Sequence, residues 1–375
     1  MTTKIKVLEV IRQGQIGGGE SHLLDLIELM DKAHFEPVCL SFTSGEMVNR
    51  LESQGIKCHV INSQRGFDLA VQKKVINLIK QEHIAIVHAH GTRAASNVLF
   101  PVVRLKLPFV YTVHGWSFHD DQNRLVYGLR KWGERAICGR ADRVICVSEG
   151  NAQTGRESFG LKNPIVIKNG VNLHRFNPHV PGQLSRADFG FDRDDFIVGF
   201  IARCTKQKSP IDFLTALEQA HAVEGNVKGL FVGEGDMDEE VDRFIAEHQM
   251  QSYIYRSPFR TDVPDLLRLM DVYCLPSLWE GLSIGLLEAM AMGKAIIVTP
   301  TDGTREVIAD SSNGLIIPFG TPKAVAEAIL CFKSDTLLCK ACGERARQLI
   351  ESRFNAQSVA DAVVGIYENV VIKEK

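Results

Sequence analysis

Residues 271–299 read DVYCLPSLWEGLSIGLLEAMAMGKAIIVT, and this stretch decides the class of fold that we expect. A short apolar run ends at Ser277, a helical pattern begins after Ser283, and a second apolar run follows Gly293. Serine is favoured just before a helix and glycine just after one. Two short buried strands on either side of a helix are typical of a parallel β-α-β unit. The stretch therefore predicts a parallel sheet with helical connections.

The same alternation of apolar runs and helical patterns extends along the chain in both directions. In the first half the runs are KIKVLEVI (4–11), EPVCLSF (36–42), KCHVI (57–61), IAIVHAH (84–90), PFVYTVH (108–114), RVICVSE (143–149) and PIVIKNG (164–170). In the second half they are DFIVGFIAR (195–203), GLFVGEG (229–235), YIYRSPF (253–259), DVYCLPS (271–277), KAIIVTP (294–300) and GLIIP (314–318). Nearly continuous apolar runs suit strands that helices cover on both faces. We therefore expect an α/β fold with two doubly wound parallel sheets.

A polar stretch separates the two sets of strands. Residues 174–195, HRFNPHVPGQLSRADFGFDRDD, contain prolines, glycines and many charges, which suits a connection between domains. We place the boundary near residue 180. The N-terminal domain is predicted to span 1–180 together with about 355–375, a terminal amphipathic helix, and the C-terminal domain 181–354.

Composition limits the class of protein. The chain has 375 residues, too many for one hydrophobic core, with 45% apolar and 23% charged residues. A net charge of −2 provides no general field for a phosphate polymer, so we expect no nucleic-acid partner. Cysteines within buried runs, the absence of a signal-like N-terminus and the absence of a long apolar run predict a reduced, cytoplasmic protein that does not span a membrane.

A glycine-rich loop follows the first apolar run. Residues 11–21, IRQGQIGGGES, precede a helical pattern, so Gly18 and Gly19 are placed where backbone can approach a phosphate. The alternative is a tight strand-to-helix turn without a ligand. A nicotinamide or flavin enzyme would need an acidic residue at the end of the second strand, which instead ends in SFTSG (41–45). An oxidoreductase is therefore a distant alternative.

Two glutamates flank the start of the helix predicted after residue 283. Glu280 lies in the loop before the helix and Glu288 lies within it. Unpaired backbone N–H groups at a helix start, here near Ser283, Ile284 and Gly285, bind phosphate, while carboxylates accept hydrogen bonds from sugar hydroxyls. This combination indicates a sugar nucleotide. The alternative is that both glutamates only stabilise the helix dipole.

Residues 280–299 closely resemble the EX7E motif of the retaining GT-B glycosyltransferases of family GT4. Further segments follow in the family's order: GGGE (17–20), TVHG (112–115), VSEG (147–150), IKNGVNLHRF (167–176), GFIARCTKQKSPIDFLTAL (199–217), VGEGDMDEEV (232–241) and FRTDVPDLLRLMDVYCLPS (259–277). The resemblance covers nearly the whole chain. It departs at 301–305, where many members have two glycines, and at Ser209, where the family usually has glycine.

The resemblance implies two Rossmann-like domains that face a central cleft, with the C-terminal helix crossing back to the N-terminal domain. It assigns Arg203 and Lys208 to the distal phosphate of a nucleotide diphosphate sugar, and Ser257 and Pro258 to the same donor site. Because these cations neutralise the leaving group, we expect transfer without a metal and without a cofactor other than the donor.

The resemblance also assigns roles around the transferred sugar. His114 hydrogen-bonds the donor sugar, Glu280 contacts that sugar, and Glu288 contacts the ribose. We therefore expect His114, Glu280, Arg203 and Lys208 to be catalytic, in a retaining reaction in which the departing phosphate accepts the acceptor's proton.

The acceptor is expected to be a glycan or a lipid-linked glycan. The candidates for its side of the site are Glu20, His88, His90, Trp116 and His119. Residues 122–143 contain six Arg or Lys against two acids, with interleaved apolar residues. This segment either contacts an anionic membrane surface at the inner face of the cytoplasmic membrane or packs as a polar-faced helix on the N-terminal domain.

The sequence thus predicts a hexosyltransferase of bacterial lipopolysaccharide, capsule or other surface polysaccharide assembly. Two alternatives stay open. One is a sugar-nucleotide epimerase or hydrolase with the GT-B fold, and the other is an inactive subunit that binds a sugar nucleotide.

Overall fold

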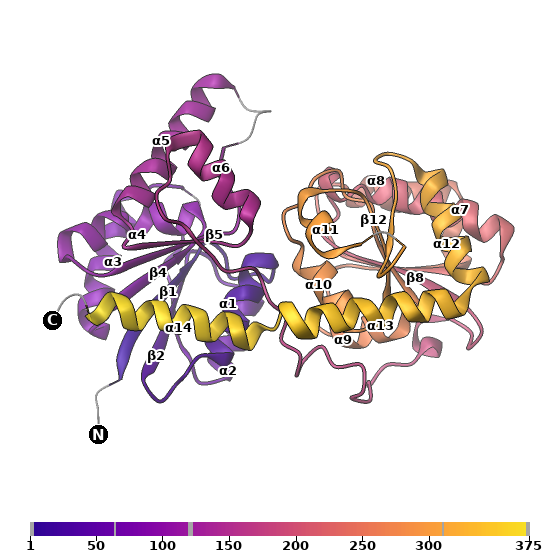
Figure 1. Cartoon of the computed structure of the whole chain (residues 1–375), viewed down its shortest axis with the longest axis horizontal. Helices are drawn as coiled ribbons and strands as arrows, with labels where there is room; N and C mark the ends of the chain where they lie inside the picture. The colour runs from indigo at the N-terminus through magenta and orange to yellow at the C-terminus, as the bar shows by residue number, and fades with distance from the viewer. Residues whose placement is uncertain (1–3, 64, 119–122, 310, 373–375) are drawn as a thin grey trace. The chain divides into compact units, whose positions relative to one another are not determined.

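The chain consists of two compact units (Figure 1). The computed structural model describes residues 4–63, 65–118, 123–309 and 311–372. Unit 1 comprises Met1–Gly170 and Ala356–Lys375, and unit 2 comprises Val171–Asn355. The boundary thus lies after Gly170 and not near 180, because Val171 donates its N–H to the carbonyl of Phe354 at 2.8 Å and Phe176 is buried in the core of unit 2.

Unit 1 is built on a parallel sheet of seven strands in the order β3-β2-β1-β4-β5-β6-β7. The strands are β1 (Ile5–Ile11), β2 (Phe35–Ser41), β3 (Lys57–Val60), β4 (Ile86–His90), β5 (Phe109–Val113), β6 (Arg143–Cys146) and β7 (Ile165–Val166). Each of the seven predicted runs forms one strand of this sheet. The strand order reverses between β1 and β4, the place where doubly wound sheets bind ligands.

Helices cover both faces of this sheet. One face packs against α1 (Gly18–Leu29), α2 (Glu46–Ser53) and α14 (Ala356–Ile372). The other packs against α3 (Leu69–Glu82), α4 (Thr92–Leu105), α5 (Arg124–Arg140) and α6 (Glu149–Phe159). The terminal helix α14 therefore belongs to unit 1, beside α1, as the sequence predicts.

A chain of buried polar groups ties α14 to the sheet. Tyr367 of α14 donates its hydroxyl to Glu9 Oε1 at 2.6 Å, and the Nδ1 atom of His88 lies 2.6 Å from the same hydroxyl. The second ring nitrogen of His88 lies 2.7 Å from Thr112 Oγ1. All four side chains are fully buried. Because burying a polar group without a partner is costly, these contacts fix α14 on β1, β4 and β5.

Unit 2 contains a second parallel sheet, of six strands in the order β10-β9-β8-β11-β12-β13. They are β8 (Phe196–Ile201), β9 (Val227–Val232), β10 (Ile254–Ser257), β11 (Val272–Leu275), β12 (Ala295–Val298) and β13 (Leu315–Ile316). All six predicted runs are present, and the order again reverses beside the first strand, between β8 and β11. Both units are therefore Rossmann-like, as predicted.

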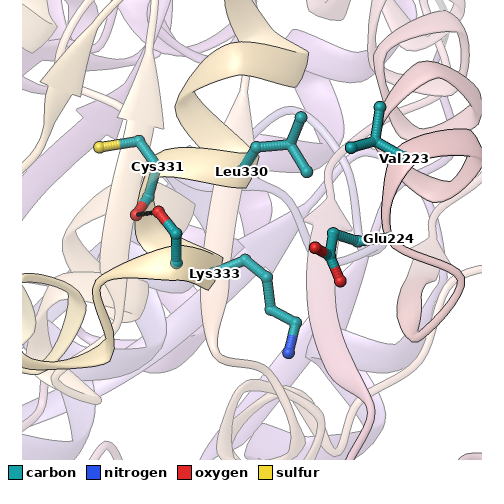
Figure 2. A pocket seen from close by; sticks show the side chains of 6 residues that line it. Val223, Glu224, Leu330, Cys331 and Lys333 are labelled. Carbon is teal, nitrogen blue, oxygen red and sulfur yellow. Dashed lines mark hydrogen bonds between the residues drawn. The ribbon is translucent and has the colours of Figure 1, made fainter.

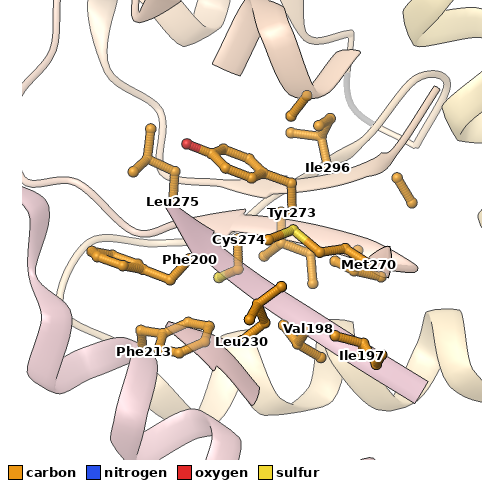
Figure 3. Packing of buried hydrophobic residues seen from close by; sticks show 14 of the residues in the cluster. Ile197, Val198, Phe200, Phe213, Leu230, Met270, Tyr273, Cys274, Leu275 and Ile296 are labelled. Atoms are coloured by element: carbon orange, nitrogen blue, oxygen red, sulfur yellow. The ribbon is translucent and has the colours of Figure 1, made fainter. Parts of the chain in front are cut away.

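The helices of unit 2 enclose an aromatic and aliphatic core (Figure 3). They are α7 (Pro210–Val223), α8 (Asp238–Glu247), α9 (Val263–Leu269), α10 (Ile284–Ala291), α11 (Asp302–Val307), α12 (Pro322–Ser334) and α13 (Thr336–Arg353). The rings of Phe200 and Phe231 stack with centroids 4.6 Å apart, and Phe213 lies against Phe200 at 5.2 Å. This packing holds β8, β9 and α7 together.

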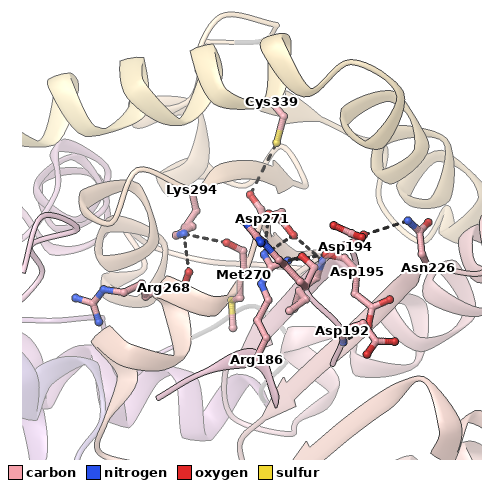
Figure 4. A network of polar contacts seen from close by, with 12 residues as sticks. Arg186, Asp192, Asp194, Asp195, Asn226, Arg268, Met270, Asp271, Lys294 and Cys339 are labelled. Carbon is pink, nitrogen blue, oxygen red and sulfur yellow. Dashed lines mark hydrogen bonds and ion pairs between the residues drawn. The ribbon is translucent and has the colours of Figure 1, made fainter. Parts of the chain in front are cut away.

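The segment predicted as an interdomain connection is bound firmly to unit 2 (Figure 4). Arg186 donates two hydrogen bonds to the Asp271 carboxylate, at 3.0 and 2.9 Å, and Asp271 Oδ2 also accepts from the N–H of Ile197 at 2.7 Å. A paired Arg and carboxylate gives a directional contact. Residues 174–195 are therefore part of the C-terminal unit.

Replacement of Tyr367 by phenylalanine should destabilise unit 1 by about 1–3 kcal/mol, because Glu9 Oε1 and His88 Nδ1 would both lose a buried partner. Tyr127→Phe, on the half-buried side of α5, should change stability by less than about 0.5 kcal/mol. Urea unfolding, combined with hydrogen exchange of the β1 and β4 amides, measures the difference. Equal effects of the two substitutions would refute the anchoring role of Tyr367.

Candidate active site

The predicted donor residues of unit 2 gather at one edge of its sheet. Arg203 and Lys208 follow β8, Ser257 and Pro258 lie at the end of β10, and Glu280 lies in the loop after β11. All are at the carboxyl ends of parallel strands, and β8 and β11 are the pair at which the strand order reverses. Ligands of doubly wound folds bind at this edge.

Lys208 and Glu280 form an ion pair within unit 2. The ammonium of Lys208 donates to Glu280 Oε1, and the hydroxyl of Ser277 donates to the same oxygen at 3.0 Å. Only 12% of the Lys208 side chain and 8% of the Glu280 side chain are exposed, whereas Arg203 is exposed. The structure therefore joins two residues that are 72 positions apart and that sequence reasoning assigned separate roles.

The start of α10 is open to an anion. The first backbone bond of this helix runs from the N–H of Leu287 to the carbonyl of Ser283, and the Ser283 side chain makes no capping bond. The N–H groups of Ile284 and Gly285 lie ahead of that bond, as in helix ends that bind phosphate. Glu288 is half-buried in the same helix.

Gly285 lies close to the side chain of Tyr273. A Cβ there would lie 3.1 Å from the hydroxyl of Tyr273, which donates to the carbonyl of Ile201 at 3.0 Å. Burial raises the pKa of Tyr273 well above its usual value, and the negative charges of Glu288 and Glu280 raise it further. The neutral phenol of Tyr273 thus packs against the first turn of α10 and hydrogen-bonds to the end of β8.

The structure shows the surroundings of both departures from the family pattern. Ser209 adopts a left-handed conformation with φ of 51°, which glycine adopts without strain, and its hydroxyl donates to Asp212 Oδ2 at 2.7 Å. In the loop 301–305, a Cβ on Gly303 would lie 1.9 Å from the carbonyl oxygen of Gly281. This loop therefore packs directly on the backbone that carries Glu280.

Sequence reasoning assigned no role to Gly233 and Gly235, which follow β9. A Cβ on Gly233 would lie 1.8 Å from the Ala202 carbonyl oxygen, and one on Gly235 would lie 2.2 Å from that of Cys204. The two glycines let the β9 loop pack against the backbone on both sides of Arg203. The VGEG segment contained this signal, as two glycines directly after a buried strand.

His114 of unit 1 lies at the carboxyl end of β5, beside the glycine loop. A Cβ on Gly19 would lie 3.6 Å from its Cδ2 atom, so the start of α1, with Gly18 and Gly19, comes close to the imidazole. His114 is half-buried. Burial lowers its pKa well below the usual value, with smaller contributions from His22 and His90, so its ring is neutral near pH 7.

A hydrogen-bonded chain behind His114 determines which ring nitrogen carries its proton. His114 Nε2 lies 3.2 Å from His90 Nδ1, and His90 Nε2 lies 2.9 Å from Glu9 Oε2. An ionised Glu9 only accepts, so His90 donates from Nε2 and accepts at Nδ1 from His114 Nε2. Neutral His114 therefore presents an unprotonated Nδ1. Neither Glu9 nor Tyr367 was singled out from the sequence.

Three of the acceptor-side predictions are wrong. His88 and His90 are 0% and 2% exposed, and both ring nitrogens of each are already within hydrogen-bond distance of protein partners. Trp116 is buried against Phe118 and Phe159 and donates its indole N–H to the carbonyl of Asn151 at 2.9 Å. Burial therefore keeps all three side chains from contacting a glycan acceptor.

The other two acceptor-side candidates stay predictions. Glu20 lies in the first turn of α1 and is buried. His119 lies outside the described residues.

A shallow hollow of about 360 Å³ lies elsewhere on unit 2, between the ends of α7 and α12 (Figure 2). Val223, Glu224, Leu330, Cys331, Lys333 and Ser334 line it. In a right-handed β-α-β connection the end of such a helix lies at the amino edge of the sheet. The hollow is thus opposite the edge that carries Arg203 and Glu280.

Comparison with protein families agrees with a fold of two Rossmann-like units. Residues 16–175 match the family described as Glycosyltransferase Family 4, and residues 183–349 match the glycosyl transferases group 1. The chain belongs to glycosyltransferase family 4. It is a glycosyltransferase of the hexosyltransferase type with the GT-B fold.

Relatives of this glycosyltransferase span its whole length. The UDP-Gal:alpha-D-GlcNAc-diphosphoundecaprenol alpha-1,3-galactosyltransferase of Escherichia coli is 25% identical, with 99% of each chain covered. The phosphatidyl-myo-inositol mannosyltransferase of Mycolicibacterium smegmatis is 26% identical over 94% of this chain and 90% of its own. The structure of HepE from Anabaena in complex with UDP-glucose superposes with a TM-score of 0.85 at 20% identity, covering 97% of this chain and 100% of that one.

Proposed function

We propose that this glycosyltransferase moves a sugar, with retention of configuration and without a metal, from a nucleotide diphosphate sugar to a glycan or lipid-linked acceptor in bacterial surface polysaccharide assembly. The observation that carries the proposal is the grouping of Arg203, Lys208, Glu280 and the start of α10 at the reversal of the unit 2 sheet. Relatives named for a diphosphoundecaprenol-linked acceptor and for phosphatidyl-myo-inositol support the class of acceptor.

The cations of unit 2 provide the stabilisation that the leaving group needs. As the bond between the sugar C1 and the phosphate oxygen breaks, the diphosphate gains negative charge. Arg203, Lys208 and the N–H groups at the start of α10 would bind that charge, so no divalent ion is required. Glu280, which holds Lys208 in place, would accept from hydroxyls of the transferred sugar, and Glu288 would accept from the ribose.

Retention follows from attack on the face that the phosphate leaves. The acceptor oxygen bonds to C1 there, and its proton passes to the departing phosphate oxygen. His114 would accept a hydrogen bond at Nδ1 from a hydroxyl of the donor sugar, since that nitrogen is unprotonated when Glu9 is ionised. This assigns Glu9 and His90 a positioning role through His114.

The donor site predicts selective stabilisation by one nucleotide. UDP-, GDP-, ADP- and CMP-linked sugars are screened by thermal shift in a buffer with EDTA. At about 100 times its dissociation constant, the matching donor should stabilise the protein by roughly 2.7 kcal/mol. Arg203→Ala and Glu288→Ala should abolish the shift, whereas Arg243→Ala, at an exposed position of α8, should keep it. A shift that survives both site substitutions would place the donor elsewhere.

Glu9→Gln should lower kcat by roughly 10- to 100-fold, the equivalent of one charge-assisted hydrogen bond, with little change in KM for the donor. An amide N–H facing His90 would reverse the donors and acceptors along the chain to His114. Glu134→Gln is the matched control, since Glu134 is another buried carboxylate of unit 1, which accepts from Tyr111 at 2.9 Å.

Deoxy donors distinguish this positioning role from a general loss of structure. The deoxy donor that is poorest for the wild type should be penalised less in Glu9→Gln, because the hydrogen bond that it lacks is already lost in the variant. Equal penalties in both enzymes would contradict the role of Glu9.

We also propose that α5 brings the enzyme to an anionic membrane surface. The helix packs on unit 1 through Glu134 and Ile137. Leu125, Leu129 and Trp132, spaced along one side of the helix, are 73%, 62% and 71% exposed. The side chains of Arg124, Arg130, Lys131 and Arg135 belong to the same helix. Exposed apolar residues with basic neighbours are typical of helices that lie at a membrane surface.

Within the described part of the chain, every helix is too short or too polar to cross a bilayer. Sedimentation with vesicles therefore tests surface contact. The double variant Leu129→Glu, Trp132→Glu should bind anionic vesicles at least about tenfold more weakly than the wild type, because two apolar side chains lose their burial in the membrane. Leu337→Glu, a change of an 80% exposed leucine in unit 2, is the control and should bind normally. Equal sedimentation of both variants would refute the contact.

A further inference from the structure

Three histidines of unit 1 converge from different elements. His22 belongs to α1, His90 ends β4 and His114 follows β5. Their ring centroids are 5.0 Å apart for His22 and His114, 5.5 Å for His90 and His114, and 5.7 Å for His22 and His90. One nitrogen from each ring lies within 4.8 Å of the other two.

These separations approach those around a tetrahedral metal ion. With metal–nitrogen bonds of about 2.0–2.1 Å, three imidazole nitrogens are roughly 3.3 Å apart and their ring centres roughly 5 Å apart. The pair His90 Nδ1 and His114 Nε2 is at 3.2 Å. The nitrogen of His22 lies within 4.8 Å of the other two, and a change of side-chain rotation would bring it nearer.

His22 has a buried nitrogen that the protein does not satisfy. Its Nε2 atom has no hydrogen-bond partner among the described residues, and the residue is 6% exposed. Burial lowers the pKa of His22 to about 3, so the ring is neutral and offers a lone pair at neutral pH. An orphaned buried polar atom in a native structure indicates a missing partner.

The surroundings of His90 match those of a metal-binding histidine. Such a histidine commonly donates its second ring N–H to a carboxylate, which fixes the ring. His90 Nε2 lies 2.9 Å from Glu9 Oε2, and Tyr367 donates to the other oxygen of Glu9. The support for a ligand at His90 Nδ1 is therefore already built into the sheet.

We propose that His22, His90 and His114 form a binding site for a divalent transition ion, Zn²⁺ or another ion that prefers imidazole, and that its binding inhibits the enzyme. Neutral imidazoles suit Zn²⁺, Cu²⁺ and Ni²⁺. When the metal binds His114 Nε2, the proton of that nitrogen moves to Nδ1, so the imidazole releases no proton overall. His114 then donates where sugar transfer needs an acceptor. This inhibition rests on the proposed function, whereas the metal binding does not.

Direct binding is measured on the whole chain in a buffer with a thiol-free reductant. Co²⁺ is followed by its visible absorption and is then displaced by Zn²⁺. The wild type should bind one equivalent. His22→Phe, which keeps a ring of similar size, should bind at least about 100-fold more weakly, a greater loss than that for an outer hydrogen-bond partner. His34→Gln, at the exposed His34 and Asp31 pair, and Cys58→Ser, beside Cys39, should bind like the wild type.

The absence of a tetrahedral Co²⁺ spectrum, or equal binding by folded His22→Phe, would overturn the proposed site. If circular dichroism shows that His22→Phe is unfolded, His22→Asn replaces it with the same expected loss. In the activity measurement, Zn²⁺ should inhibit the wild-type enzyme and EDTA should restore its activity. His22→Phe should keep its activity in the presence of Zn²⁺. Stoichiometric binding without inhibition would refute the effect on His114. Turnover in EDTA together with no metal binding would reject this site and leave the proposed transferase function standing.

Discussion

The burial of one carboxylate, that of Glu9, is the constraint on which unit 1 depends. A charge in the middle of β1 is tolerated only if donors surround it. Tyr367 and His90 supply them, from the last helix and from β4, and His88 completes the contacts of Tyr367. The same carboxylate that requires α14 to cover the sheet also determines the orientation of the imidazoles leading to His114. The cohesion of the unit and the chemistry at its edge thus depend on the same charge.

In unit 2 another largely buried carboxylate, that of Glu280, is paired at the carboxyl edge of the sheet. Lys208 and Glu280 lie in loops after neighbouring strands and partly neutralise each other. Gly233 and Gly235 in the loop after β9, and Gly303 in the segment after β12, allow two segments to pack against the backbone that carries Arg203 and Glu280. Close backbone contact therefore fixes the loops that carry Arg203 and Glu280. Any side chain larger than hydrogen at the three glycine positions would prevent that contact.

Hydrophobic runs made the strands predictable, because each buried parallel strand is apolar nearly throughout. The position of the candidate donor residues at one edge of the sheet was predictable for a related reason, since the ends of such strands are marked by glycine, charge and helix starts. Glu9 and Tyr367 were not, because they are 358 positions apart and each lies in a pattern that its apolar neighbours explain. His88 and His90 lie on the same face of β4, and their spacing alone could not distinguish a buried side chain from one that is open to an acceptor glycan. The boundary after Gly170 depends on the contact of Val171 with Phe354, a pairing of distant segments.

The assignment of α14 to unit 1 has a consequence for synthesis. Unit 2 is continuous in sequence, so it can complete its core as soon as residue 355 has left the ribosome. Unit 1 is interrupted by unit 2, so it lacks Tyr367 until all of unit 2 has been synthesised. During translation Glu9 is therefore without its phenolic partner, and the ordering of His114 is delayed. The nascent chain can therefore complete unit 2 before it completes unit 1.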